Sequence, residues 1–127
     1  MTNIPMSPGH HRVMPYFLVN DADAFITFLQ NVLGATEREC HRDEKGGVMH
    51  AEYDLSDSVL MVGQSTEQWP ERPTACYLYV ADTDATHAAC LKAGCTEIYA
   101  PRDEHYGVRG SGILDRWGNT WWLARML

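Results

Sequence analysis

The sequence predicts an α+β fold in which two βαβββ repeats form paired, strongly curved mixed β-sheets around a groove, with the helices outside. Near the start of each half, the spacing of apolar residues changes from that of a strand to that of a helix. The segment YLYVADTDA at residues 77–85 matches YFLVNDADA at residues 16–24, which indicates an internal repeat. A polar stretch with two prolines, residues 65–73, lies almost at the midpoint of the chain.

These observations define the expected domain organisation. A flexible N-terminal arm, residues 1–11, should precede a single domain at residues 12–127, because 127 residues leave little room for a second independent core. Within this domain, the halves 12–64 and 74–126 should be joined by the linker 65–73.

The first half should begin with a strand and a helix. Residues 12–20 are rich in β-branched and aromatic residues, which favours a strand. In residues 22–33 apolar side chains recur at spacings of three and four, which marks one face of a helix. Asp21 or Asp23 can cap the start of this helix, and Gly34 can end it.

Three further strands should follow in each half. In the first half, the turn signals DEKGG and LSDS separate three extended runs, at residues 36–42, 48–54 and 58–64. In the second half, we expect a helix from about Asp84 to Ala93 that packs through Ala85, Ala88, Ala89 and Leu91. The strands after it are expected at residues 95–100, 108–115 and 120–126.

The composition excludes several classes of function. The net charge is −7 and there is no run of basic residues, so nucleic acid is not an expected partner. The longest apolar runs are far shorter than the roughly 20 residues that span a bilayer, and the N-terminal residues lack the apolar core of a secretory signal. We therefore expect a cytoplasmic protein without a membrane partner, whose four cysteines stay reduced.

Four segments carry a resemblance to a known family: PYFLVNDADAFITFLQNVLGA, HAEYDLSDSVLMVG, LYVADTDA and YGVRGSGILDRWGNTWWL. Together they resemble the vicinal oxygen chelate superfamily, which includes glyoxalase I, bleomycin resistance proteins, fosfomycin resistance enzymes and extradiol dioxygenases. The resemblance covers residues 12–124 and looks closest to the PhnB-like branch. It implies the duplicated fold, but not one function, because this scaffold hosts isomerases, transferases, oxygenases and binding proteins.

The resemblance also implies where a metal would be held. Metal-dependent members use His, Gln or Glu on the first and last strands of each half. Counting from VND, VAD and DRWGN places these positions at Met14, Ala75 and Trp122, with the fourth near Met61 or Gly63. None of these residues offers the nitrogen or oxygen ligand that such a metal needs.

A shift of the count by one residue does not restore the metal site. It offers Pro15, Cys76 and Trp121, which still do not build a shell of oxygen and nitrogen ligands. We therefore expect no metal and no other cofactor.

His50 and Glu52 are candidate ligand-binding residues. They lie two positions apart in the strand VMHAEYD and therefore point to the same face. There they would act as a general base and the residue that orients it, as ligands, or as partners in a structural hydrogen bond. His41 lies on the preceding strand of the hairpin, but the sequence alone does not show that it converges with His50.

Tyr106 and Arg109 form a second candidate pair, in the segment HYGVRG. The glycines beside them permit a close backbone approach, and the Arg109 guanidinium is suited to a carboxylate or phosphonate. The alternative is a structural salt bridge to Asp103 or Glu104.

Aromatic side chains supply the remaining candidates. Trp121 and Trp122 alternate on the last strand, so one should face the helix layer while Trp122 faces the groove, where it stacks on a ligand or fills the cavity. Tyr16 and Tyr77 lie on the two first strands, and Trp69 in the linker is placed to cover the groove.

Two classes of function remain open, with catalytic residues unassigned. The first is a metal-independent protein that binds a small organic molecule, flat or cationic, as bleomycin resistance proteins do. The second is a lyase, isomerase or dioxygenase-type enzyme with an atypical site, using His50, Glu52 or Tyr106 as acid or base. In either case the resemblance implies a homodimer, and a pure interaction domain is the third alternative.

Overall fold

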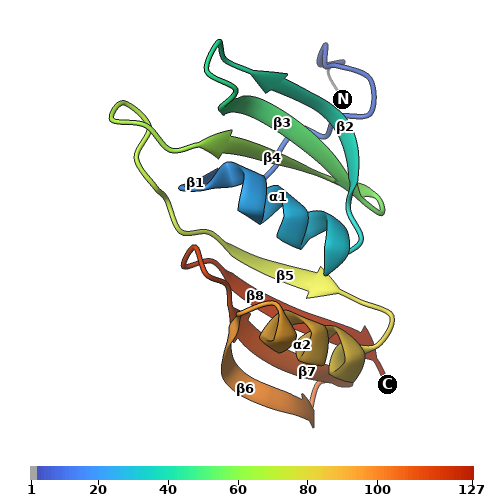
Figure 1. Cartoon of the computed structure of the whole chain (residues 1–127). Helices are drawn as coiled ribbons and strands as arrows, with labels where there is room; N and C mark the ends of the chain where they lie inside the picture. Colours follow the sequence, from blue (N-terminus) through green and yellow to red (C-terminus); the bar gives the residue numbers. More distant parts are fainter. Residues whose placement is uncertain (1–2) are drawn as a thin grey trace. The chain divides into compact units, whose positions relative to one another are not determined.

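The computed structural model describes residues 3–127. The chain divides into two compact units, one that ends at Glu71 and one that begins at Arg72. Each unit contains a strand, a helix and three further strands, in that order (Figure 1). The predicted duplication of a βαβββ element is confirmed.

The first unit is a four-stranded mixed sheet with one helix against it. Its elements are β1 (Tyr16–Val19), α1 (Ala22–Asn31), β2 (Thr36–Arg42), β3 (Val48–Leu55) and β4 (Ser58–Gln64). The strand order is β1-β4-β3-β2, and β1 runs parallel to β4 while the other pairs are antiparallel. The last strand of the unit therefore lies between the first strand and the meander.

Helix α1 begins at a capped turn and ends near the predicted glycine. Asp21 adopts a left-handed conformation with φ of 48°, and its side chain accepts a hydrogen bond from Ala24 N at 3.3 Å. Gln64 Oε1 accepts from Ala22 N at 2.8 Å and so ties the helix start to β4. The buried face has the predicted spacing and consists of Ala22, Phe25, Ile26, Phe28 and Leu29.

The second unit repeats this arrangement. Its elements are β5 (Ala75–Tyr79), α2 (Thr83–Lys92), β6 (Thr96–Asp103), β7 (Val108–Leu114) and β8 (Thr120–Met126), with strand order β5-β8-β7-β6. Tyr77 lies beside Trp122 as Tyr16 lies beside Met61 in the first unit. The strand register of the two units is thus the same at the offset that the sequence repeat predicts.

The packing of α2 differs from the prediction that it uses Ala85, Ala88, Ala89 and Leu91. The buried residues are Thr83, His87 and Cys90. Thr83 donates its hydroxyl hydrogen to Arg109 O at 2.7 Å, and the His87 ring lies 2.8 Å from Ser111 Oγ. Polar side chains can line this interface because their hydrogen bonds to β7 are satisfied there.

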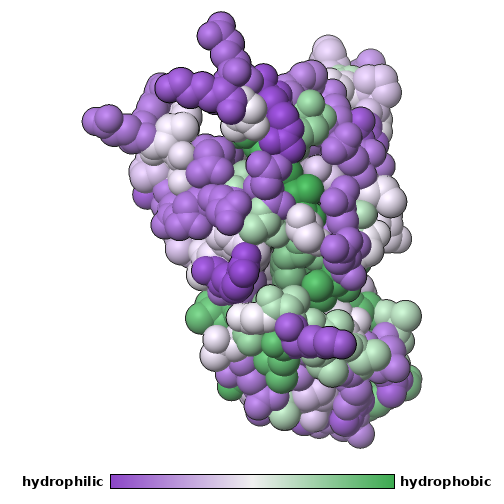
Figure 2. Space-filling model, viewed as in Figure 1, coloured by the Kyte–Doolittle hydropathy of each residue, from purple (hydrophilic) through white to green (hydrophobic). Residues whose placement is uncertain are grey.

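Other features follow the expectation closely. The predicted bounds of β2, β4 and β8 agree with the structure, whereas the first strand starts later than predicted, at Tyr16. The four cysteines are free thiols. Within residues 3–127, no helix has the length and apolar character needed to cross a membrane. In the view of Figure 2, hydrophilic side chains cover most of the first unit.

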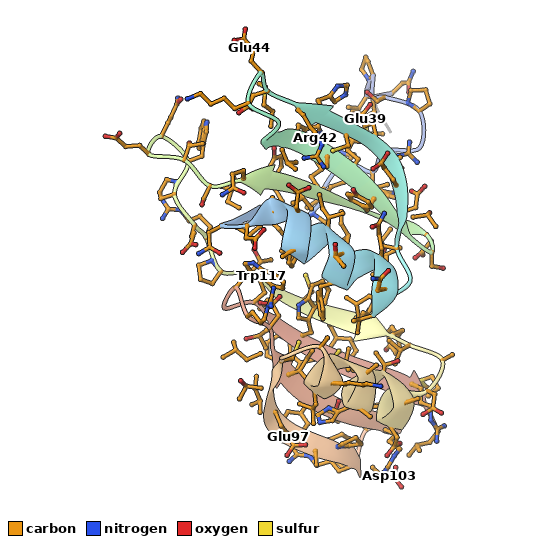
Figure 3. The ribbon with its side chains drawn as sticks, in the orientation of Figure 1. Glu39, Arg42, Glu44, Glu97, Asp103 and Trp117 are labelled. Atoms are coloured by element: carbon orange, nitrogen blue, oxygen red, sulfur yellow. The ribbon has the colours of Figure 1, made fainter. Side chains whose placement is uncertain are left out.

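A single buried carboxylate closes the turn between β7 and β8. Asp115 accepts hydrogen bonds at 2.9 Å from the backbone N–H groups of Trp117 and Asn119, from the Asn119 side-chain amide and from the Trp121 indole. Asn119 Oδ1 in turn accepts from Thr74 N at 2.8 Å, so the turn also holds the start of β5. Figure 3 shows Trp117 at this turn.

We expect Asp115→Ala to lower the free energy of unfolding by about 3 kcal/mol, because at least two buried donors lose their acceptor and each unsatisfied group costs about 1–3 kcal/mol. The measurement is urea unfolding followed by circular dichroism. The matched control is Asp57→Ala at the exposed turn between β3 and β4, which should change stability by no more than about 0.5 kcal/mol. Equal unfolding midpoints for the two variants would contradict this role of Asp115.

Candidate functional site

The candidate site lies on the face of the first sheet that points away from α1. Residues paired side by side on neighbouring strands share a face. Phe17, Val62 and Ala51 form one such row and are fully buried. The adjacent row runs across all four strands on the opposite face and consists of Tyr16, Met61, Glu52 and Glu39.

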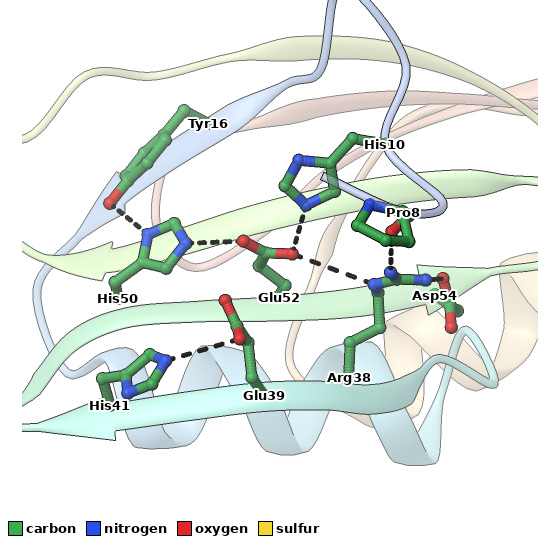
Figure 4. Close-up of polar contacts among 9 residues, drawn as sticks. All are labelled: Pro8, His10, Tyr16, Arg38, Glu39, His41, His50, Glu52 and Asp54. Carbon is green, nitrogen blue, oxygen red and sulfur yellow. Dashed lines mark hydrogen bonds and ion pairs between the residues drawn. The ribbon is translucent and has the colours of Figure 1, made fainter. Parts of the chain in front are cut away.

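A chain of hydrogen bonds crosses this face (Figure 4). Tyr16 Oη lies 3.0 Å from His50 Nδ1, and His50 Nε2 lies 2.9 Å from Glu52 Oε2. On the other side of the same carboxylate, His10 Nε2 lies 2.6 Å from Glu52 Oε1, and Arg38 Nε is 3.8 Å from that oxygen. The predicted pair of His50 and Glu52 is therefore brought together, with Tyr16 and His10 as added partners.

Glu52 is a buried carboxylate, 5% exposed, that stays ionised. Burial alone would raise its pKa, but hydrogen bonds with His50, His10 and Glu39 outweigh the burial and lower the pKa to about 2. Burial raises the pKa of Tyr16, and the negative charge of Glu52 raises it further. The face thus presents a fixed anion beside a neutral phenol and an imidazole.

The N-terminal segment is attached to this face, although residues 1–11 were expected to form a flexible arm. Besides the His10 contact, Pro8 O accepts a hydrogen bond from Arg38 Nη2 at 2.8 Å. His11 Nε2 lies 2.8 Å from Asp57 O. The sequence did not predict the His10 contact, because two histidines in a segment with proline and glycine give no indication of which distant strand they contact. Met1 and Thr2 lie outside the described residues.

A cavity of about 630 Å³ opens beside the hydrogen-bonded chain, within the first unit. Its wall includes Tyr16, Leu18, Met49 and Trp69. Trp69 is 59% exposed, and its loop is held by hydrogen bonds in both directions with Thr66, at 2.8 and 3.0 Å. Tyr16 and Trp69, both predicted from the sequence, therefore contribute to one cavity.

Gly63 makes room for the Tyr16 ring in this wall. A Cβ atom at Gly63 would lie 3.2 Å from Tyr16 Oη and 3.3 Å from the ring, which is closer than most Cβ contacts. The glycine at this position thus leaves room for the phenol beside His50.

In the second unit, Tyr77 and Trp122 lie on the face of the sheet that points away from α2. Trp121 is buried and Trp122 is 38% exposed, so the two alternate as strand geometry predicts. Tyr99 packs over Gly112, where a Cβ atom would lie 2.8 Å from its ring. The Tyr106 side chain is exposed. The pKa of Tyr77 is raised by partial burial of its own hydroxyl and by the neighbouring Tyr106.

Arg109 takes the structural alternative rather than a free position beside Trp122. Its guanidinium bonds both oxygens of Asp84, at 2.7 and 3.0 Å, and Asp103 at 3.1 Å. Strand alternation puts Arg109 on the α2 side of β7 with Ser111. The expectation that Arg109 and Trp122 line the same surface is therefore corrected: they lie on opposite faces of one sheet.

His87, Ser111 and Glu97 form a set that resembles a hydrolase triad in composition. His87 lies 2.8 Å from both Ser111 Oγ and Glu97 Oε1. Ser111 is 0% exposed, however, and is covered by α2, so no substrate reaches its hydroxyl. The set joins α2 to β6 and β7; Figure 3 shows Glu97 on β6.

The positions at which the resemblance implies a metal do not suit one. Ala75 and Trp122 carry no ligand atom for a divalent ion, and Met14 and Met61 offer thioether sulfur. Met61 lies beside Tyr16. These residues therefore do not fit the metal that the resemblance implies.

Sequence relatives cover most of the chain. An uncharacterised protein of Mycobacterium bovis is 25% identical over 122 residues, which span 87% of this chain and 80% of the relative. An uncharacterised protein of Mycobacterium tuberculosis shows the same identity and spans 72% of the relative.

Solved structures share the fold at low identity. The crystal structure of TioX from Micromonospora sp. ML1 superposes with a TM-score of 0.77 at 20% identity, covering 93% of this chain and 100% of that chain. TnmS3, an antibiotic binding protein from Streptomyces sp. CB03234, has a TM-score of 0.70 at 18% identity with the same coverage.

The family is shown by a match to a sequence profile that extends over most of the chain. Residues 9–123 match the profile described as Glyoxalase/Bleomycin resistance protein/Dioxygenase superfamily. The matched segment includes both units and the hydrogen-bonded face of the first. The chain belongs to the glyoxalase/bleomycin resistance protein/dioxygenase superfamily.

Proposed function

We propose that the protein binds a small organic molecule in the cavity of the first unit, without a metal at the family positions. The observation that carries this proposal is the cavity of about 630 Å³ between Tyr16, Leu18, Met49 and Trp69. Its volume falls in the range of about 300–1,000 Å³ that is typical of small-molecule sites, and its wall combines apolar side chains with few polar groups.

The wall favours a flat molecule that is neutral or cationic. Trp69 offers an exposed indole for stacking, and Tyr16 offers one hydroxyl beside it. The carboxylate of Asp43 also borders the cavity, and the net charge of −7 disfavours anionic ligands. The likeness to an antibiotic binding protein supports binding as a use of this fold, but does not identify the ligand.

The aromatic residues of the second unit offer a separate surface for an aromatic ligand. Tyr77, Tyr106 and Trp122 give that unit an exposed aromatic surface on which a ring can stack. We also assign the chain to the PhnB-like branch, on the segments that carry that resemblance.

An enzyme of the lyase, isomerase or dioxygenase type is the second candidate. It is favoured by the hydrogen bonds that join Tyr16, His50 and Glu52, since a histidine oriented by a carboxylate is a common general base. Turnover of a molecule found by ligand screening, followed by mass spectrometry, separates this candidate from simple binding.

Trp69→Ala is expected to weaken binding about tenfold, since loss of stacking removes about 0.5–1.5 kcal/mol in addition to the buried area. A thermal-shift screen of flat neutral and cationic aromatic compounds supplies the ligand, and isothermal titration calorimetry measures its affinity. Trp69→Phe should retain most of the affinity.

Trp117→Ala is the matched control, because it removes a loop tryptophan that does not line this cavity. It should bind as the wild type does. Equal affinity for Trp69→Ala and Trp117→Ala would show that the ligand does not use the cavity. A folded protein that binds nothing in a broad screen would favour the interaction-domain alternative.

We further propose that the protein is a homodimer. Large aromatic side chains stay exposed on the second unit of the single chain, including Tyr77, Tyr79 and Trp122, and surfaces of this kind often mark protein interfaces. Light scattering at micromolar concentration should give twice the 14.4 kDa mass of one chain. A mass of one chain would count against the dimer.

A further inference from the structure

We propose that Glu39, His50 and Glu52 form a binding site for one divalent transition-metal ion on the first sheet, away from the family positions. One ligand atom from each residue lies within 4.8 Å of the other two. Figure 4 shows the three side chains converging from the adjacent strands β2 and β3. This site departs from the expectation that the chain uses no metal, and it stands independently of the proposed organic ligand.

Two carboxyl groups face each other at the centre of this cluster. Glu39 on β2 lies directly opposite Glu52 on β3, and Glu52 is buried. Glu39 also pairs with His41, whose Nε2 lies 3.4 Å from Glu39 Oε2. A cation bound between the two carboxyl groups would be attracted to both.

The second unit shows that the fold does not need these charges. There the corresponding strand pair carries Tyr99 opposite Gly112. The two strand pairs share a register shift at the same place, between Glu37 and Glu39 and between Glu97 and Tyr99. Because Tyr and Gly build the same strand pair, the charged pair in the first unit points to a purpose other than folding.

The two oxygens of Glu52 have separate partners. Oε1 accepts a hydrogen bond from His10 and lies near Arg38, which fixes the orientation of the carboxylate. Oε2 faces His50. An ion bound at Oε2 therefore leaves the contacts of Oε1 in place.

His50 is oriented for coordination through Nε2. Tyr16 Oη lies 3.0 Å from Nδ1, and Nε2 lies 2.9 Å from Glu52 Oε2. An ion held by Nε2 would leave Nδ1 beside Tyr16 Oη, which is the kind of outer partner that metal-bound histidines usually have.

The donor set defines the class of ion. One imidazole nitrogen with carboxylate oxygens suits Zn²⁺, Ni²⁺, Fe²⁺ or Mn²⁺, and the absence of a thiolate from the set disfavours Cu⁺. Three protein ligands leave a position for water or for an oxygen of a bound molecule. Tyr16 contacts His50 and also lines the cavity, so it connects the ion site to the proposed ligand site.

The test is titration of the full chain with Zn²⁺ alone after treatment with a chelator, by isothermal titration calorimetry. We expect one ion per chain. Glu39→Gln and His50→Gln should each weaken binding by at least about tenfold, because even outer partners of metal ligands are worth about 10- to 100-fold. Tyr16→Phe removes such an outer partner and should weaken binding about tenfold.

Two matched controls separate this site from incidental binding. Glu44→Gln changes an exposed carboxylate of the turn between β2 and β3, and His11→Ala changes an exposed histidine next to His10. Both should bind Zn²⁺ as the wild type does. Circular dichroism checks the fold of each variant, and X-ray absorption of the Zn²⁺ complex should show nitrogen and oxygen ligands without sulfur.

The proposal is overturned if wild-type protein binds no Zn²⁺, if Glu39→Gln and His50→Gln bind as tightly as wild type, or if His11→Ala abolishes binding. Failure here is distinguishable from failure of the proposed function. The titration contains no organic molecule, and Trp69→Ala should leave the affinity for Zn²⁺ unchanged.

Discussion

The structure depends on one pairing in each unit, that of the first strand with the last in parallel. Two parallel neighbours cannot be joined by a tight turn, so the chain between β1 and β4 must leave the sheet and return. Helix α1 begins this connection and packs against one face of the sheet. Strands β2 and β3 complete it and extend the sheet along the free edge of β4. With the helix on one side, no other helix or strand in the described part of the same unit covers the opposite face, and the candidate site lies there, where Pro8 and His10 are attached.

The two units place different chemistry on the same backbone. The faces that point away from the helices have equivalent strands and share one register shift, between Glu37 and Glu39 and between Glu97 and Tyr99. The first carries Tyr16, His50 and Glu52 in one hydrogen-bonded chain. The second carries Tyr77, Tyr99 and Trp122 over glycine-containing strands. The fold is duplicated, but the side chains on the equivalent face of each sheet are different.

The sequence predicted the elements well because their signals are local. Strand alternation, the three-and-four spacing of α1 and the Asp21 cap each depend on residues within one or two turns. The same locality explains the pairing of His50 with Glu52, which share a strand face. The repeat at residues 77–85 allowed the second unit to be predicted, because the elements that follow it are spaced as in the first unit.

Long-range partners were not predictable in this way. His10 contacts Glu52 although 42 positions separate them in the sequence, and Arg109 bonds Asp84 on α2 in addition to the predicted Asp103. Helix α2 buries Thr83 and His87 because acceptors and donors on β7 satisfy them, and no periodicity of apolar residues can reveal such an interface. The face that Arg109 occupies follows from the register of β7 with β8, which the glycines beside Arg109 do not reveal.

The low pKa of Glu52 ties the anchoring of the N-terminal segment to acidity. The carboxyl has a pKa of about 2 in the folded chain against an ordinary value of 4.5, so the unfolded chain binds a proton at this group more readily. Its contribution to stability is complete above about pH 4.5 and is lost as the pH falls toward 2. Because the pKa in the folded chain is about 2, the carboxylate keeps its charge there until the pH approaches 2. Below that pH, protonation affects a residue that joins the N-terminal segment, the sheet and His50, so those attachments weaken together.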